Sequence, residues 1–450
     1  MKNKFLMAVL LILFLVGTSV AAEQITIDDV RALALANSRS LAQYNLELRS
    51  SVLNEKTQGY AMLPSLSVGA NASVNLWEAP ANQGKSMEES LNVGASVSIS
   101  QKIYDGGITS LNKSIAAISS DTVRQETLAA YFTVLETADS YYYAALEAAA
   151  ALEAAESSLA TAALSLSLAE ARMQNRNISA GDYLEVMAEK EARETAKNQA
   201  RRELSMAKAR LLDLTGLKEL PDLEPVDFAI YDALVQKLAA IDDSALDALY
   251  NFLWQEIAVR NPDLLKAGLN FQSAEANLKL AQKAYLPSLS ASLSTGLNYN
   301  NTESKLEAAA GSLRLSLSIP LDFWVTAANV EKNKIALDKA NLNYKATGAS
   351  VELELRSVLI NLAAQAGSIL SAGKAREYAQ SHFDYVMELF RLSQRTPSEL
   401  STAETLVRTN RNSFAGARYK FLQAFSTLRN LGSFDSTEAL MDLLLRGLVQ

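Results

Sequence analysis

The sequence has 450 residues, a formal net charge of −8 and no cysteine. Without cysteine it forms neither disulfides nor thiolate metal sites. An acidic chain without a basic cluster is also a poor candidate for nucleic-acid binding.

The first 22 residues have the pattern of a secretory signal peptide. Lys2 and Lys4 precede an apolar run from Leu6 to Val16, and small residues end at Ala22. The run is too short to span a bilayer comfortably, and no later stretch reaches the ~18 apolar residues of a membrane helix. We expect an exported protein whose formal net charge changes from −8 to −10 when the two lysines are removed.

Two similar patterns recur about 220 residues apart, which indicates an internal duplication. LPSLSVGANAS contains Pro64, and LPSLSASLSTG contains Pro287. Each copy reads as helix, strand, turn, strand, very long helix, break and helix. The predicted organisation is a first repeat over 23–216, a linker or equatorial segment over 217–243, a second repeat over 244–432 and a C-terminal equatorial segment over 433–450.

Each repeat is predicted to open with a helix, over 27–60 and 244–285. Pro64 and Pro287 end these helices, because proline disfavours helical backbone at and before its own position. Polar residues at both starts can accept hydrogen bonds from the first free backbone N–H groups. The candidate N-caps are Thr26 or Asp28 in the first repeat and Asp243 or Ser244 in the second.

Strands follow as two hairpins, over 64–105 and 287–322. In AYLPSLSASLSTGLN, leucine, alanine and threonine fall on one parity, whereas serine, glycine and asparagine fall on the other. This alternation predicts strands with one apolar and one polar face. The polar stretches at 78–89 and 300–311 are the predicted loops.

Two very long helices are predicted next, over 109–174 and 326–394. At 1.5 Å per residue, each is about 100 Å long. Apolar residues recur at heptad spacing, which favours packed coiled coil over a disordered low-complexity segment. Polar turns at 175–183 and 393–400 break them, and shorter helices return. The predicted C-caps of these shorter helices are Gly216 and Gly432.

The strands have the length and alternation of a membrane barrel wall, with apolar residues toward lipid and polar residues toward the lumen. Four strands cannot close a barrel and lipid tolerates no open edge, so other subunits must complete it. Small polar residues suit a wide wet lumen, which favours three chains over two. A soluble sheet with one solvated face is the alternative, and the near absence of lysine and glutamate from the polar face disfavours it.

The chain resembles the TolC-like outer-membrane efflux proteins, the outer-membrane factors of tripartite export systems. The two LPSLS strands, SISQKIYDGG at Ser98–Gly107, the tip turns and the duplication carry this resemblance over essentially the whole mature chain. It implies a mainly α fold of long antiparallel coiled-coil helices, with four strands per chain contributing to a trimeric twelve-stranded β-barrel.

The resemblance also implies function: a non-catalytic exit duct in the cell outer membrane that extends into the periplasm. Its implied partners are two further copies of the chain, outer-membrane lipid, a periplasmic adaptor and an inner-membrane pump, either RND-type or ATP-driven. Two departures from the family pattern are visible, and neither changes the expected fold because glycine mainly eases the bend from strand to helix. Lys102 replaces a common proline, and Trp324 and Val325 replace the glycine pair in the second copy.

Residues near the tip turns are implied to close the periplasmic end. Glu399 stands at the first acidic-ring position and Thr402 at the second, where the family has another acid; Arg395 and Asp182 match positions that form contacts between helices. In a trimer, Glu399 would form a ring of three carboxylates that favours cations. The alternative is that Glu399 and Asp182 only complement helix dipoles, since Asp182 directly precedes the helix predicted from Tyr183 and Glu399 follows Pro397 and Ser398.

Four aromatic residues flank the predicted hairpins at strand ends: Trp77, Trp324, Tyr104 and Tyr299. Aromatic belts mark membrane interfaces, so these residues are candidate interface anchors. Plain packing of large side chains is the alternative for each.

No pattern predicts a catalytic residue, a cofactor or a metal site. His382, the only histidine, is predicted to lie on a helix surface with no nucleophile ordered near it. GSILSAGKA at 367–375 lies inside a long helix and has five residues, instead of the four of a phosphate loop, between its glycines. Charged stretches such as AEKEARE at 188–194 are predicted to be solvated helix faces.

Two other non-enzymatic functions stay open. A periplasmic coiled-coil adaptor would lack paired strands of lipid length, and an exported trimeric structural or adhesin protein would lack the duplication. For a duct, the cargo stays open among drugs, metals and proteins, because the pump selects it.

Overall fold

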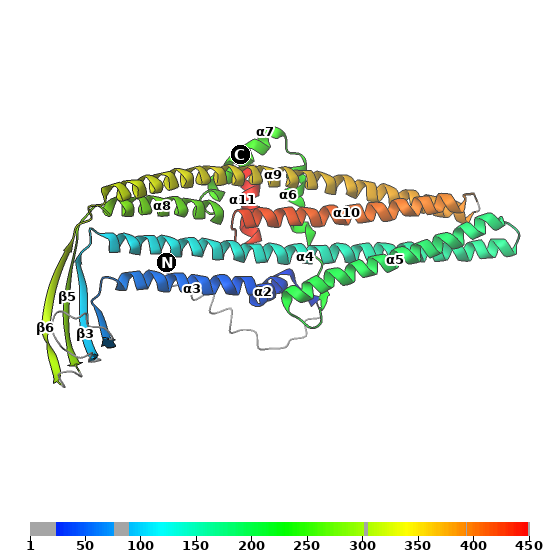
Figure 1. Cartoon of the computed structure of the whole chain (residues 1–450). Coiled ribbons are helices and arrows are strands. Elements are labelled where there is room, and N and C mark those ends of the chain that lie inside the picture. Colours follow the sequence, from blue (N-terminus) through cyan, green and yellow to red (C-terminus); the bar gives the residue numbers. More distant parts are fainter. Residues whose placement is uncertain (1–23, 76–89, 301–304, 393, 449–450) are drawn as a thin grey trace. The chain divides into compact units, whose positions relative to one another are not determined.

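The computed structural model describes residues 24–75, 90–300, 305–392 and 394–448 (Figure 1). The predicted signal peptide, Trp77 and the predicted loop at 78–89 therefore lie outside the described residues. Two compact units share the chain. The first comprises the described parts of Met1–Leu41, Ala130–Asn261 and Glu352–Gln450, and the second those of Ala42–Ala129 and Pro262–Val351.

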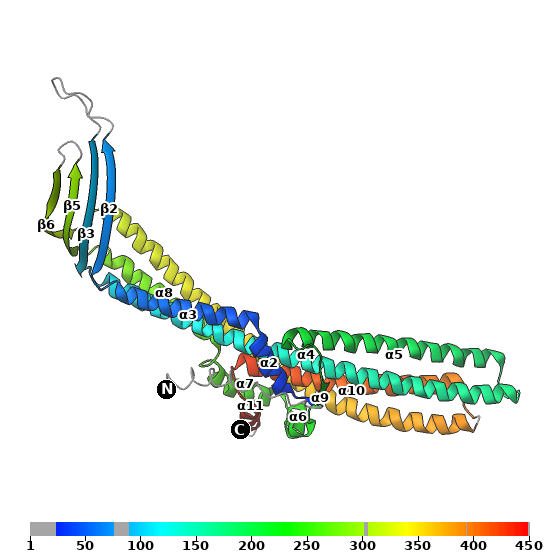
Figure 2. The same cartoon turned by 90° about the horizontal axis from the view of Figure 1, so that it is seen from below.

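The second unit contains an antiparallel sheet with the strand order β2-β3-β5-β6 (Figure 2). Both predicted hairpins are confirmed, and the β3–β5 pairing joins them. The predicted loop at 300–311 was too long: β6 begins inside it, because backbone pairing with β5 continues there whatever the polarity of the side chains. The strands are β2 Ser65–Asn75, β3 Ser90–Tyr104, β5 Ser288–Asn300 and β6 Lys305–Ser318.

The register lines up residues of one kind across all four strands. One row is apolar, Leu66–Ile99–Leu293–Leu313, and the next is serine only, Ser67–Ser98–Ser294–Ser312. The apolar row is exposed in the isolated chain, with Leu313 72% exposed. Serine hydroxyls hydrogen-bond across the polar row, at 2.7 Å for Ser67–Ser98 and 2.9 Å for Ser294–Ser312. A one-residue slip would mix the rows, so the alternation pins the register.

The turn after β3 explains the glycine pair of the first repeat. Gly106 and Gly107 have φ of 67° and 82°, a left-handed conformation that favours glycine. Asp105 accepts hydrogen bonds from the backbone N–H groups of Gly107 and Thr109, at 2.9 and 2.8 Å. The chain thereby turns from strand into α4, Ile108–Gln174. In the second repeat the chain passes from β6 into α9, Phe323–Arg391, without a glycine pair.

The opening helix of each repeat is broken, whereas a continuous helix was predicted. In the first, α2 (Ile27–Asn37) and α3 (Arg39–Tyr60) are separated by Ser38, whose Oγ accepts from the Leu41 N–H at 3.2 Å. In the second, α7 (Asp243–Ile257) and α8 (Pro262–Lys283) are separated before Pro262, which lacks an N–H to continue the helix. Thr26 caps α2 as predicted, whereas Asp242 caps α7.

In the first unit, segments of four long helices lie side by side (Figures 1 and 2). These are α4, α5 (Ala180–Thr215), α9 and α10 (Pro397–Leu431). Phe390 and Phe421 are among the fully buried side chains. Smaller elements complete this unit: β1 Gln24–Ile25, β4 Asp222–Leu223, η2 Phe228–Tyr231, α6 Asp232–Ala239 and α11 Thr437–Gly447, with α2 and α7. His382 is exposed on α9, as predicted.

The two predicted C-cap glycines differ in conformation. Gly216 ends α5 with φ of 72°, the predicted left-handed cap. Gly432 ends α10 with φ of −89°, and the positive φ falls on Ser433 instead. A Cβ on Gly432 would lie 2.1 Å from the Phe434 ring, so close packing, not backbone conformation, requires glycine there.

Among the helices that the structure describes, none is long and apolar enough to cross a membrane.

Candidate functional site

The two predicted tip turns lie at one end of the first unit (Figures 1 and 2). One joins α4 to α5, where Ser179 caps α5 and accepts from the Asp182 N–H at 3.0 Å. The other joins α9 to α10, where Thr396 and Glu399 form a reciprocal capping box. Both helices therefore start at fixed positions close to the candidate gate residues.

Arg395 and Glu399 contact each other. Arg395 Nη1 lies 2.5 Å from Glu399 Oε1, and the other oxygen of Glu399 accepts from the Thr396 N–H at 2.9 Å. Both side chains are largely exposed, at 42% and 40%. Asp182 is exposed in the first turn of α5, and among the described residues no hydrogen bond or ion pair joins it to this pair. The structure thus brings together two of the three candidates.

Hydrogen bonding holds the pKa of Glu399 below its ordinary value. The Thr396 backbone N–H is the largest cause, followed by Arg395. A carboxyl whose folded pKa is depressed stabilises the fold above its unfolded pKa, and that contribution is lost as pH falls through the folded pKa.

We therefore expect the first turn of α10 to keep its cap at pH 5 and above and to lose it only below the ordinary glutamate pKa of about 4.3. Hydrogen exchange of the 397–401 amides against pH, corrected for intrinsic rates, measures this. Glu388 on the preceding helix provides the control as Glu388→Gln, because its side chain is exposed and forms an ion pair of 3.8 Å with Arg391 instead of a helix cap. Identical pH profiles for wild type and Glu399→Gln would contradict the expectation.

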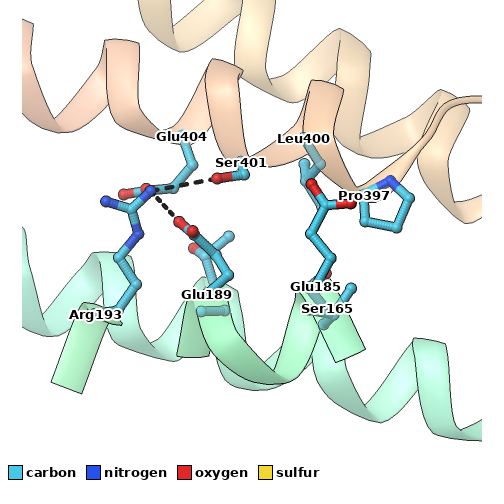
Figure 3. Close-up of a pocket in the computed structure, with 11 residues that line it drawn as sticks. Ser165, Glu185, Glu189, Arg193, Pro397, Leu400, Ser401 and Glu404 are labelled. Carbon is cyan, nitrogen blue, oxygen red and sulfur yellow. Dashed lines mark hydrogen bonds and ion pairs between the residues drawn. The ribbon is translucent and has the colours of Figure 1, made fainter. Parts of the chain in front are cut away.

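A buried ion cluster lies between α5 and α10, behind the tip (Figure 3). The side chain of Arg193 is 10% exposed, and its Nη2 lies 2.9 Å from Glu404 Oε2 and 2.7 Å from Thr405 Oγ1. The same nitrogen is in ion-pair contact with Glu189. A single guanidinium therefore faces two carboxylates.

This cluster borders a cavity of about 40 Å³, enough for a water molecule. Glu189 Oε1 and Glu404 Oε2 are buried there without a well-directed hydrogen bond, although both contact Arg193. Water can supply the missing donors. The cluster is therefore polar and held together by one cation.

The prediction of a solvated face over AEKEARE was wrong for Arg193. Val186, Arg193, Ala200 and Ala207 are the buried residues at seven-residue intervals along α5. Arg193 thus occupies a core position of the heptad pattern and pairs inside the helix bundle. That spacing was visible in the sequence, but its partner Glu404 was not, because it lies on a distant segment.

An apolar cluster lies next to this cavity, where α9 packs against α10 near the tip. Val386, Met387 and Phe390 of α9 pack with Leu400 and Ala403 of α10. The Arg172 guanidinium stacks 4.4 Å from the Phe390 ring and donates to the Phe390 carbonyl oxygen. These contacts position the α9–α10 turn.

A second buried ion cluster centres on Asp139 of α4, whose side chain is fully buried. Asp139 accepts from Arg31 Nε at 2.6 Å and from Arg429 Nη2 at 2.8 Å, and it also accepts from the Ser426 hydroxyl. Burial lowers the pKa of Arg31, but the hydrogen bonds and charge of Asp139 raise it more. For Arg429, burial and the nearby Arg31 lower the pKa more than Asp139 raises it. Sequence patterns missed this cluster because its members lie on three distant segments.

The aromatic candidates fall at different places. Tyr104 ends β3 beside Leu289, and Tyr299 lies near the opposite end of the sheet beside Val93. Trp324 lies in the first turn of α9 and is 74% exposed, so it is on a helix and not at a strand end as predicted. The prediction took the second hairpin to extend to 322, whereas β6 ends at Ser318.

Comparisons with known proteins identify the class. The model of the family described as outer membrane efflux protein matches residues 30–217 and 253–432. The chain therefore belongs to the outer membrane efflux protein family. A comparison with curated protein sequences gave no match.

Solved structures share the fold over almost the whole chain. A membrane protein from Pseudomonas aeruginosa has a TM-score of 0.75 at 17% identity, covering 91% of this chain and 90% of that chain. The Campylobacter jejuni CmeC outer membrane channel has a TM-score of 0.74 at 15% sequence identity, covering 94% of this chain and 89% of that channel's chain. The Neisseria gonorrhoeae MtrE outer membrane channel, in its open state, has a TM-score of 0.71 at 17% sequence identity, covering 93% of this chain and 94% of that channel's chain.

The protein is thus an outer-membrane efflux channel that extends into the periplasm. The family match over both halves favours this exit duct over the adaptor and adhesin alternatives.

Proposed function

We propose that three copies of the chain close a twelve-stranded barrel in the outer membrane. The two unpaired edges of the sheet carry this proposal: in the described sheet, β2 and β6 each have one neighbour. An open edge is not tolerated in lipid, and joining β6 of one copy to β2 of the next satisfies both edges. The exposed leucine rows then face lipid, and the serine rows face the lumen.

Protein purified in detergent tests this assembly. We expect a band at three times the chain mass in unheated SDS gels that collapses on heating, and discrete ion-conducting steps in planar bilayers. Native mass spectrometry counts the copies directly. A monomer without conductance would contradict the assembly, and a dimer would replace twelve strands with eight.

We further propose that Arg395 and Glu399, with a smaller part for Asp182, narrow the periplasmic end. In a trimer each is present three times, so the exposed tip carries a ring of carboxylates and guanidiniums. The Arg395–Glu399 contact of 2.5 Å and the capping box support it, because they hold Glu399 at a fixed place.

The Arg395→Ala variant is expected to raise single-channel conductance in planar bilayers, because it removes a charged side chain from the narrow end. Arg201→Ala, which removes an exposed arginine from the body of α5, is the matched control and is expected to leave conductance unchanged. Unchanged conductance of Arg395→Ala, with the trimer intact, would overturn the gate assignment.

We also propose that the chain acts without catalysis, as a passive duct for a periplasmic adaptor and an inner-membrane pump of RND type or driven by ATP. Membership in a family of channels supports this. Chemical crosslinking in cells followed by identification of the captured proteins tests the partners. Capture of neither adaptor nor pump would contradict the proposal.

A further inference from the structure

A groove in the first unit is separate from the tip and from the cavity behind it. It has a volume of about 770 Å³ and is formed by α4, α9 and α10. Small-molecule sites in proteins have volumes of about 300–1,000 Å³. We call it the arginine groove, because Arg376, Arg411 and Arg418 line it together with Phe414.

Two of these arginines converge on one aromatic ring. The guanidinium of Arg376 lies 4.4 Å from the centre of the Phe414 ring, and that of Arg418 lies 5.6 Å from it. Arg418 also stacks 4.3 Å from the Phe228 ring. The rings therefore hold two cations close to each other.

No carboxylate in the described part of the chain forms an ion pair with any of the three. Arg411 donates only to neutral acceptors, Gln380 at 2.9 Å and Ser157 at 3.3 Å. This contrasts with Arg193, Arg31 and Arg429 of the same unit, each of which contacts a carboxylate. The three guanidiniums of the groove therefore keep donor groups that no carboxylate of the described residues occupies.

Like charges held close together repel each other. Burial is the largest cause that lowers the pKa of Arg418, and the positive charge of Arg376 adds to the lowering, whereas Tyr419 and the carboxylates of Asp232 and Asp227 offset part of it. Glu153 and Glu377 also line the groove but pair with none of the arginines, so its lining has an excess of one positive charge. A bound anion would relieve this repulsion.

The hydrogen-bond donors that line the groove also suit a bound anion. Guanidinium groups are donors only and match carboxylate and phosphate in bidentate geometry. Tyr419 lines the groove, and burial raises the pKa of its phenol, which therefore stays protonated and can donate. The ring of Phe414 offers an apolar surface beside these donors.

We propose that the arginine groove binds a small organic anion, with its carboxylate or phosphate on Arg376, Arg411 and Arg418 and a flat apolar body against Phe414. This goes beyond the duct function and does not depend on the proposed gate. An acidic side chain of another protein would present the same carboxylate. The volume of the groove and its aromatic wall favour the small molecule.

Calorimetric titration of the full chain in detergent tests the proposal, with benzoate as probe and benzamide as its neutral counterpart. We expect saturable benzoate binding that weakens with added salt, and benzamide binding at least about tenfold weaker, the loss typical of a charge-assisted hydrogen bond. Arg376→Gln and Phe414→Leu should each weaken benzoate severalfold to about tenfold. Arg202→Gln, an exposed arginine on α5, matches the charge change and should leave binding unchanged.

Three outcomes would overturn the proposal: no saturable benzoate binding, equal affinity for benzamide, or equal loss in Arg202→Gln. Binding of a glutamate-rich peptide without binding of benzoate would assign the groove to a protein partner and overturn it as well. Circular dichroism and the unheated gel band show that each variant is folded and assembled. Inorganic phosphate as a second probe distinguishes a site for the anionic group alone from one that also requires the ring.

Discussion

Replacing Asp139 with asparagine is expected to lower the free energy of unfolding by about 3–5 kcal/mol, because it removes one partner of a buried ion cluster. Asp139 is fully buried and is the carboxylate that both Arg31 and Arg429 contact. Asparagine preserves the size of the side chain but leaves two guanidiniums facing each other in the protein interior. Urea unfolding of the detergent-solubilised protein, followed by loss of helical circular dichroism, measures the effect.

Asp28→Asn is the matched control. Asp28 pairs with the same Arg31, at 2.7 Å, but its side chain is 81% exposed. An exposed pair contributes at most about 1 kcal/mol, so this variant should unfold almost as the wild type does. Adding Arg429→Met to Asp139→Asn should recover part of the loss, since it removes one of the unpaired cations. Equal stability of Asp139→Asn and Asp28→Asn would contradict the expectation.

The Arg193→Met variant is expected to loosen the contact between α5 and α10. Methionine keeps most of the apolar stem but leaves Glu404, only 9% exposed, and Glu189 without their cation. Removing one partner of such a buried group costs about 3–5 kcal/mol. Faster hydrogen exchange of backbone amides over 186–200 and 400–407 measures the effect, because weaker packing lets these segments open more often.

Lys190→Met on the same helix is the control. Lys190 pairs with Glu191 and Glu194 at 3.0 and 3.1 Å, in an exposed arrangement within α5 alone. Replacing Lys190 should leave hydrogen exchange of the 400–407 amides unchanged, because its ion pairs do not contact α10. If Lys190→Met and Arg193→Met accelerated exchange equally, the ion pair between helices would not be what stabilises this contact.

Much of the fold follows from local sequence patterns. Alternation of leucine with serine predicts the paired strands, and the structure places Leu66, Ile99, Leu293 and Leu313 in one row. Thr26 followed by Asp29 is a capping box that depends on neighbouring residues only. Breaks at Ser38 and before Pro262 were missed, because the surrounding helical pattern continues across them and short loops interrupt it only weakly.

In the candidate site, too, some contacts follow from local sequence and others do not. Arg395 and Glu399 are four residues apart on one helix, so their contact follows from helix geometry once the helix start is known. The pairing of Arg193 with Glu404, and of Asp139 with Arg31 and Arg429, joins segments more than 100 residues apart. No local pattern encodes such a partner. The seven-residue spacing of Val186, Arg193, Ala200 and Ala207 indicates only that Arg193 is buried and must be paired.

By itself, the sequence determined the α and β periods, the repetition of the hairpins and the chemical character of the two sheet faces, because these depend on the spacing of side chains along one segment. Only the tertiary structure decided which charges are buried and with which partners. It also decided that Arg376, Arg411 and Arg418 line one groove, in which none of them forms an ion pair with a carboxylate of the described residues. The reason is physical: burial and pairing depend on which distant helices pack together, and that is set by the free energy of the whole packed bundle rather than by any one segment.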